Sequence, residues 1–453
     1  MMLRSLLLPS ALLTALWPVL AAGQTPLSLG QAMARADRQA FPNRIAQAQV
    51  AGRSADRDRT LQGLLPTVRA EAGWIRTTDP LNAFGFALRQ RTVTQAAFAP
   101  DRLNHPPATS NLGTGVVLEQ PLINPNLWFA RSAASSMADA AHAKARWTAS
   151  GTRLEVIAAY YGGILVREQV VALEAGHAAA RSHVRMAQSL LDQGMVTRSD
   201  VLLAEVKAGE LEASLAAAQG DLALAVGRLA TTLGSPDDTT ALMLPAALPA
   251  LDLIRQLHQA LDSALPRADV EAARLGVDAA QGNLRRARAT MLPRINSFAR
   301  YDWNDSSALA GGQPSWTVGV MASWSFFSGG AELADQRAAR AQRDGAVAMA
   351  EAAEAGARLD RVARENALAV ALVTAGINGR AVAQSAEARR IVARKYEGGL
   401  ATVTELLEAN AIEVRSQLEY AAARYRAILA AAAWRQALGG DLMTMTILDG
   451  GTR

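Results

Sequence analysis

Hydrophobic and polar positions change their period along the chain in the same order twice. Residues 29–64 and 253–291 permit a helix, and each segment is followed by a Leu-Pro pair, at Leu65-Pro66 and Leu292-Pro293. Proline ends a helix and restricts the residue before it to extended geometry. We therefore predict one helix in each half that ends immediately before its Leu-Pro pair.

After each Leu-Pro pair, apolar and polar residues alternate with a period of two. Such alternation over about ten residues is typical of strands in an outer-membrane barrel. We predict four strands, at about 66–76, 112–123, 293–304 and 315–327. Tryptophan concentrates at membrane interfaces, and these segments carry Trp74, Trp303, Trp316 and Trp324. The alternative is an amphipathic hairpin in a soluble domain.

Two long helix-permissive segments follow the strand pairs. Residues 126–193 and 331–398 are rich in alanine, arginine, glutamate and glutamine and contain no internal proline. A continuous helix of about 68 residues would be about 100 Å long, and globular domains have no use for such a length. We predict two of these helices, each ending at a glycine, which is a usual C-terminal cap.

Both long helices lead into the same turn. "GMVTRSDVLLAE" at 194–205 and "GGLATVTELLEAN" at 398–410 match at an offset of 205 positions. Thr197 and Thr402 are each followed three residues later by an acid, which predicts a capping box and the start of a new helix. A seven-residue repeat then predicts packing against the preceding helix: Leu407, Val414, Ala421 and Ile428.

The chain is therefore predicted to hold two copies of one plan: helix, strand, strand, long helix, turn, helix. The predicted parts are a first repeat at 24–234, a linker at 235–252, a second repeat at 253–440 and a C-terminal tail at 441–453. The strands of the first pair are joined by a long loop at 77–110, which we expect either to constrict the outer end of the strands or to be disordered.

The N-terminus has the three-part pattern of a secretory signal peptide. Residues 1–23 hold one arginine, an apolar run and small residues, with cleavage expected after Ala21, Ala22 or Gly23; a membrane anchor is the alternative. The chain contains no cysteine, so we expect neither disulfides nor lipidation after the signal. No further run of 18 apolar residues follows, so strands in a closed barrel are the expected way to cross a membrane.

Charge and histidine placement argue against other function classes. The net charge is +5 over 453 residues and is not gathered in a basic domain, which argues against nucleic acid as a partner. The five histidines are scattered, and His177 and His183 lie far apart around one helix, so no metal site is predicted. No phosphate-binding loop or nucleophile motif stands out. We therefore expect neither an enzyme nor a bound cofactor.

Four strands cannot sit alone in a bilayer because both edges of an open sheet would be unpaired. Several chains must share one barrel: two chains give eight strands and a filled interior, whereas three give twelve and room for a pore. The helices would then form a long tube away from the membrane. These arguments predict an oligomer without fixing the number of chains.

The signal peptide, the doubled plan, the Leu-Pro pairs and the Gly-…-Thr-x-x-acid turns resemble the TolC-like outer membrane efflux protein family. The resemblance covers essentially the whole mature chain. It implies a mixed α and β membrane protein, a homotrimer with a twelve-stranded β-barrel in outer-membrane lipid, continued by a periplasmic α-helical barrel. It also implies a channel without a catalytic site, which docks to an inner-membrane pump through a periplasmic adaptor protein.

The resemblance assigns roles to the second turn. The family's acidic constriction matches Glu405 and Glu408, which lie on one helix face; three chains would place six carboxylates around a narrow pore. The alternative for Glu405 is a capping acid at a helix N-terminus. Only the second copy adds the second acid, because Leu203 occupies the corresponding place in the first copy.

Two further features follow from the resemblance. A closing network matches Tyr396, Asp200 and Ser199. Ala401 stands where the family's better-known pattern has an arginine, so this network is incomplete here. The alternative is that Tyr396 only packs between helices.

The adaptor-docking turns match two small apolar tips, for which a plain tight turn is the alternative: Gly194, Met195, Val196, Gly399, Leu400 and Ala401.

The predicted function is therefore a passive outer-membrane duct for small molecules or proteins. The alternative is an exported periplasmic coiled-coil or adaptor protein without a pore. Such a protein would not be expected to carry two barrel-like strand pairs with tryptophan at their ends.

Overall fold

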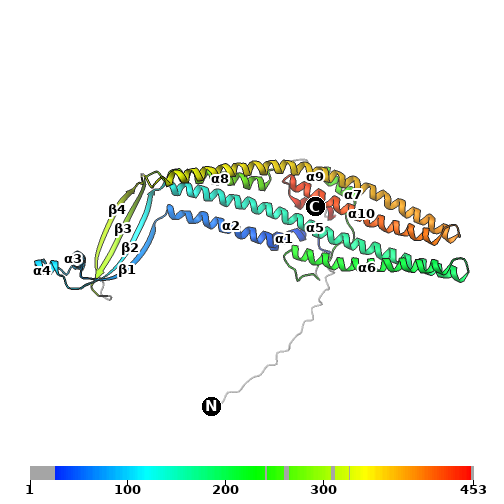
Figure 1. Ribbon diagram of the computed structural model, residues 1–453, viewed down its shortest axis with the longest axis horizontal. Coiled ribbons are helices and arrows are strands. Elements are labelled where there is room, and N and C mark those ends of the chain that lie inside the picture. The colour runs from blue at the N-terminus through cyan, green and yellow to red at the C-terminus, as the bar shows by residue number, and fades with distance from the viewer. Residues whose placement is uncertain (1–25, 240–241, 260–264, 308–311, 326, 450–453) are drawn as a thin grey trace, which may run out of the picture.

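The computed structural model describes residues 26–239, 242–259, 265–307, 312–325 and 327–449; the predicted signal peptide at 1–23 lies outside this part. The molecule is elongated, with a small sheet at one end and two helical hairpin tips at the other (Figure 1). Helices run along the whole distance between them.

The first helix of each half is broken, where the sequence predicted one continuous helix. The first half has α1 (Leu29–Gln39), α2 (Phe41–Arg59) and the 3-10 turn η1 (Thr60–Gly63). The second half has α7 (Leu251–Gln259) and α8 (Ala268–Ala289). Pro42 and Pro266 explain the breaks, because proline fits the first turn of a helix but interrupts a helix interior. Ala40 between α1 and α2 has an extended ψ of 135°.

The four strands form one antiparallel sheet in the order β1-β2-β3-β4. Their bounds are β1 Thr67–Thr77, β2 Thr109–Ile123, β3 Arg294–Asp305 and β4 Gln313–Ser323. The predicted positions are right to within a few residues. The largest difference is at β4, which ends before Trp324; the Trp324 indole instead donates a hydrogen bond to the Met291 carbonyl (2.9 Å).

The register places apolar residues of all four strands on one face of the sheet. Val68 pairs with Leu118, Leu118 with Ala299, and Ala299 with Val318. The other face carries ion pairs between strands: Arg69–Glu119 (2.7 Å) and Arg300–Glu71 (3.4 Å). The predicted alternation is thus present, with apolar residues on one face of the sheet and charged residues on the other.

Two long helices extend from the sheet to the tips. They are α5 (Pro125–Asp192, 68 residues) and α9 (Ala331–Glu397, 67 residues). At the tips the chain reverses into α6 (Arg198–Thr232), which packs on α5, and α10 (Val403–Ala437), which packs on α9 and α5. All four residues of the predicted seven-residue repeat are buried: Leu407, Val414, Ala421 and Ile428.

The main hydrophobic core lies at the middle of the molecule, where α1, α5, α7 and α10 converge. Tyr160 and Tyr161 of α5 are fully buried there. The segment predicted as a C-terminal tail contributes to this core through the 3-10 helix η3 (Leu442–Asp449), in which Leu442 and Met445 are buried. The Asp449 carboxylate accepts hydrogen bonds from both tyrosine hydroxyls and from the Leu29 amide.

The long loop between β1 and β2 is folded rather than extended. It contains α3 (Pro80–Arg89), the 3-10 turn η2 (Gln95–Phe98) and α4 (Pro100–Asn104). These elements lie beyond the strand ends, away from the helical part (Figure 1).

Both long helices contain an 18-residue window that is apolar enough to cross a membrane by length and composition. The mean hydropathy is 1.3 in α5 and 1.2 in α9. Within the molecule, 44% of the α5 window is buried but only 11% of the α9 window. The α5 window therefore contributes to the helical core, whereas the α9 window leaves apolar surface uncovered.

Candidate functional site

The two hairpin tips are built from identical backbone motifs. Gly194 and Gly399 follow the long helices with φ of 75° and 71°, a region that glycine adopts without a Cβ penalty. The Met195 amide donates to the Leu190 carbonyl (2.9 Å), and the Leu400 amide to Lys395 (2.7 Å). These are Schellman caps, which satisfy carbonyls left free at a helix end.

Each tip then starts its return helix with a complete capping box, as the sequence predicts. The Thr197 hydroxyl accepts a hydrogen bond from the Asp200 amide, and the Asp200 carboxylate accepts one from the Thr197 amide (2.9 Å). Thr402 and Glu405 repeat the arrangement, with 2.7 Å between the Thr402 amide and the Glu405 carboxylate. Two threonines 205 positions apart therefore define the same local structure.

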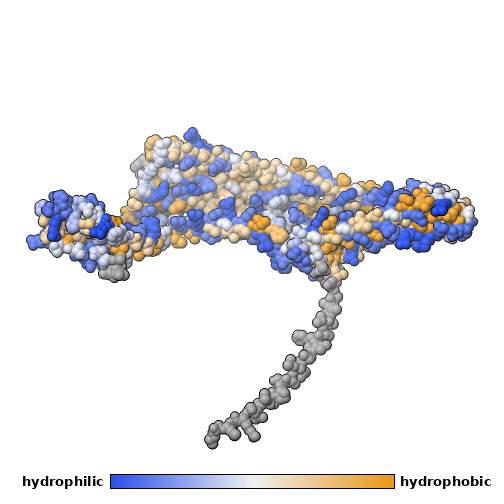
Figure 2. All heavy atoms as spheres, turned by 60° about the horizontal axis from the view of Figure 1, so that its bottom comes forward, coloured by the Kyte–Doolittle hydropathy of each residue, from blue (hydrophilic) through white to orange (hydrophobic). Residues whose placement is uncertain are grey.

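The outermost residues of the tips are apolar and exposed. Met195 is 62% exposed and Leu400 is 82% exposed, while Val196 and Ala401 are partly covered. Figure 2 shows hydrophobic atoms gathered at this end of the molecule among polar ones. The predicted adaptor-docking turns thus form a small apolar surface at the extreme end of the helical part.

Directly behind the tips, a small hydrophobic cluster joins the two hairpins. Ala204 of α6 is buried with Tyr396 of α9 and with Val403, Leu406 and Leu407 of α10. The tips are therefore not independent, because opening one hairpin from the other would expose this cluster.

The predicted constriction residues point away from that cluster. Glu405 and Glu408 are exposed, whereas Leu406 and Leu407 between them are buried. Hydrogen bonds from the Thr402 amide and hydroxyl lower the pKa of Glu405. Glu408 makes no ion pair within the part of the chain that the structure describes. Glu405 is thus bound to its helix cap, whereas Glu408 is exposed, and its role in a constriction remains a prediction.

The predicted closing residues are close together but not hydrogen-bonded. Tyr396 is 4% exposed, and its hydroxyl has no hydrogen-bond partner among the described residues. Burial and the nearby negative charge of Asp200 raise the pKa of Tyr396. Asp200 and Ser199 instead bond to Thr197, with hydroxyl contacts of 2.7 Å in both cases. The family-like link remains a prediction.

The structure adds a buried titratable group to which the sequence reasoning gave no role. His183 of α5 is 8% exposed, and neither ring nitrogen has a hydrogen-bond partner in the described chain. Burial and the positive charge of Arg389 lower the pKa of His183. Arg389 of α9 is itself paired with Glu413 of α10. The sequence shows three histidines on α5, but not that α9 brings an arginine close to His183.

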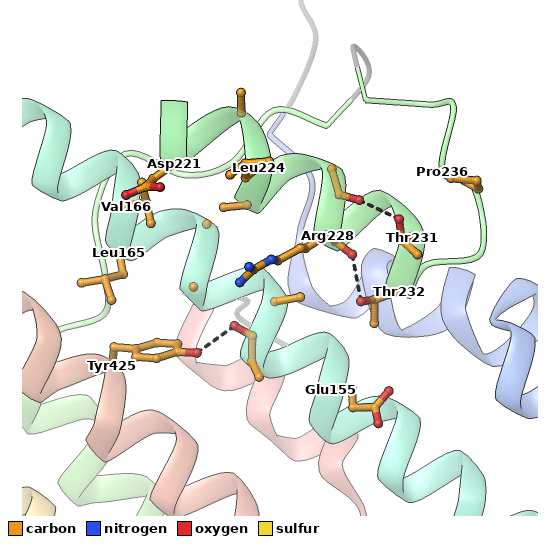
Figure 3. Close-up of a pocket in the computed structure, with 17 residues that line it drawn as sticks. Glu155, Leu165, Val166, Asp221, Leu224, Arg228, Thr231, Thr232, Pro236 and Tyr425 are labelled. Atoms are coloured by element: carbon orange, nitrogen blue, oxygen red, sulfur yellow. Dashed lines mark hydrogen bonds between the residues drawn. The ribbon is translucent and has the colours of Figure 1, made fainter. Parts of the chain in front are cut away.

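A groove with a volume of about 1050 Å³ lies between α5 and α6 near Tyr425 of α10 (Figure 3). The Arg228 side chain extends from α6 toward α5, and the Tyr425 hydroxyl donates to the Ala158 carbonyl (3.2 Å). Most of the lining is alanine, glycine and leucine. No group of metal-ligating side chains occurs here or elsewhere in the described residues. The groove therefore has the character of a packing surface.

Comparisons with known proteins agree with the geometry. Residues 258–440 match the family described as "Outer membrane efflux protein". Protein CyaE of Bordetella pertussis is 29% identical over 313 residues, which is 65% of this chain. The match covers 63% of CyaE, so the chain spans less than two thirds of that relative.

Solved structures have the same fold. The outer membrane protein VceC of Vibrio cholerae superposes with a TM-score of 0.74 at 20% identity, over 91% of this chain and 96% of that one. The outer membrane channel CmeC of Campylobacter jejuni gives 0.75 at 14% identity, over 91% and 85%. The outer membrane channel MtrE of Neisseria gonorrhoeae, in its open state, gives 0.72 at 18% identity, over 92% and 89%.

Proposed function

This chain belongs to the TolC-like outer membrane efflux protein family, and from that premise we propose that three copies form one continuous duct. The four-stranded sheets would close into a twelve-stranded barrel in the outer membrane, and the helices would form a tunnel through the periplasm. The duct is a passive exit for small molecules or proteins. It would dock to an inner-membrane pump through a periplasmic adaptor protein at the apolar hairpin tips.

The observation that carries the proposal is the sheet with its two free edges. Among the described residues, strands β1 and β4 each pair on one side only. The apolar face of this sheet is exposed, with Trp316 at 73%, Val318 at 67% and Val68 at 66%. An exposed apolar face fits lipid, and in lipid every backbone group must be paired. Only further strands from other copies can pair both edges.

The helical part supplies a second surface that a single chain leaves uncovered. One face of α9 carries large apolar side chains at helical spacing, opposite its buried face at Leu368 and Ala375. This stripe consists of Leu359, Val362, Val370, Val373 and Ile377, which are 52–72% exposed. Beside it, α9 and α10 form an apolar groove of about 620 Å³. An uncovered stripe of this kind marks an interface.

The test measures assembly and conduction together. We expect the wild-type protein in the outer-membrane fraction as a heat-modifiable oligomer that conducts ions in planar bilayers. Val373→Glu places a charge in the α9 stripe, and we expect it to abolish the oligomer because the charge would have to be buried without a partner. Glu365→Lys, also exposed on α9 but outside the stripe, should assemble normally.

A soluble periplasmic monomer that does not conduct would contradict the proposal. That outcome would favour the alternative function, an exported coiled-coil or adaptor protein that uses its hairpins for binding.

A further inference from the structure

We infer that the folded segment at 78–108 is a lid that narrows the outer mouth of the duct with apolar side chains. The inference rests on the proposed function, because it takes the polar face of the sheet as the lumen. It concerns a part of the molecule at the opposite end from the hairpin tips (Figure 1).

The lid is anchored to the polar face of the sheet by a chain of side-chain amides. The Gln90 amide, at the end of α3, donates to the Asn111 side-chain oxygen of β2 (2.9 Å) and to the Ser110 carbonyl (2.8 Å). Asn111 in turn donates to the Asn304 side-chain oxygen of β3 (2.9 Å). All three side chains are buried, at 4–8% exposure, so the anchor is shielded from competing water.

The strand register shows which face this is. Side chains two residues apart share a face of a strand, so Asn111 lies on the same face as Glu119, and Asn304 on the same face as Arg300. Arg69 and Glu71 complete the ion pairs of that face. In a barrel with lipid on its apolar side, the lid is therefore folded inward, over the lumen.

One face of α3 is used for anchoring, and the opposite face is apolar and uncovered. Ala83 and Phe86 lie on the buried face of α3, and α3 contacts β2 and α4. Leu81 and Leu88, seven residues apart, are 82% and 52% exposed. Because the anchored face meets the barrel wall, Leu81 and Leu88 point toward the centre of the mouth.

The backbone after α3 is held in an unusual conformation. Arg91 has φ of 55° and is the one non-glycine residue with positive φ among the described residues. Its guanidinium donates to the Pro314 carbonyl of β4 (3.3 Å). Phe98 then packs edge-on against Phe84 with ring centroids 5.7 Å apart. The segment thus has its own small core and makes side-chain hydrogen bonds to strands β2 and β4.

The dimensions match a constriction. Twelve strands spaced by about 4.8 Å and tilted by about 40° enclose a backbone diameter of about 24 Å. A helix with its side chains is about 10 Å across, so three helices in a triangle need about 22 Å. Three inward-folded copies of α3 would therefore fill most of the mouth. Apolar constrictions of this kind oppose ion passage by excluding water.

Cysteine substitution tests the lid directly, because the chain has no cysteine of its own. In planar bilayers, Leu81→Cys channels should lose most of their current when Cd²⁺ is added on the loop side, and a chelator should restore it, because three thiolates near the axis bind a soft metal ion. The control is Val318→Cys, which is exposed on the apolar face of β4; it should be insensitive to Cd²⁺.

A second variant measures the size of the opening. Replacing residues 80–104 by a short glycine-serine linker should admit larger uncharged polymers from the loop side than the wild type admits. If wild-type channels conduct but neither Leu81→Cys nor Leu88→Cys responds to Cd²⁺, the lid inference is overturned and the duct stands. If the wild-type protein forms no channel, the proposed function itself fails, and the lid inference fails with it.

Discussion

At the residue scale, the buried His183 can make the packing of the two hairpins sensitive to pH, because it lies close to a positively charged arginine. It lies on α5 with Arg389 of α9 beside it, and Arg389 is held by Glu413 of α10. The contact thus joins α5 of the first hairpin to α9 and α10 of the second. A proton on His183 would add a second positive charge where burial already opposes the charged form.

The sign of the pH dependence follows from the lowered pKa of His183. A histidine in the unfolded chain titrates near 6.5. The folded chain binds the proton less readily, so the stability contributed by neutral His183 is complete above pH 6.5 and is lost as the pH falls from there through the folded pKa. Lowering the pH should therefore loosen the contact between α5 and α9.

We expect His183→Leu to reduce the fall in Tm that the wild type shows between pH 7.5 and pH 5.5. The leucine fills the buried site and cannot take up a proton. His142→Leu, on an exposed position of the same helix, is the matched control and should keep the wild-type pH dependence. Equal pH dependence in the wild type and His183→Leu would show that another group controls it.

At the element scale, the doubled plan is visible in the glycines that end the four helices of the hairpins. Gly234 and Gly439 have φ of 79° and 74°, 205 positions apart, as do Gly194 and Gly399 at the tips. The two pairs differ in their surroundings. Gly194 and Gly399 have open space where a Cβ would stand. A Cβ at Gly439 would lie 2.7 Å from the Leu265 carbonyl oxygen, and one at Gly234 would overlap the Gln39 carbonyl.

Alanine substitutions should therefore separate conformational strain from steric overlap. Gly194→Ala and Gly399→Ala should lower the free energy of unfolding by about 1 kcal/mol, because alanine is strained in the left-handed backbone conformation. Gly234→Ala and Gly439→Ala must also displace backbone atoms, so we expect a cost on the order of 3 kcal/mol. Thermal unfolding followed by circular dichroism measures the difference. Similar Tm values for all four variants would mean that the helix ends are free to shift apart.

Much of the order of helices and strands could be predicted from the sequence because it depends on local residue patterns. The capping boxes at Thr197 and Thr402, the alternation in the strands and the length of α5 and α9 are all confirmed. The breaks near Pro42 and Pro266 were missed because the flanking residues are good helix formers. Long-range placement was also missed: no local pattern shows that the C-terminal Asp449 meets Tyr160 and Tyr161, or that Gln90 meets Asn111.

At the scale of the whole molecule, the two hairpins differ in chemistry although their backbones match. The first tip carries one acid in its capping box, Asp200, and the second carries Glu405 with Glu408 one turn later. The lowered pKa of Glu405 follows from its cap, so this carboxylate is charged at neutral pH in every copy. A trimer would therefore gather charged carboxylates from the second hairpin only, which makes that hairpin the candidate gate.

The gate can be tested by conductance of Glu405→Ala/Glu408→Ala channels in planar bilayers. Carboxylates around a narrow pore attract cations, so the wild type should prefer cations and be blocked by multivalent cations. The double variant should lose both properties. The single variants distinguish the contributions of the two acids to conductance.

Glu408→Ala leaves the Thr402–Glu405 cap intact. Glu405→Ala also weakens the start of α10, by about 1 kcal/mol. Glu397→Ala, an exposed acid at the end of α9, controls for a general loss of negative charge at the tips. Unchanged cation preference and unchanged block in the double variant would remove the acidic constriction and leave Glu405 with the capping role that the structure already shows.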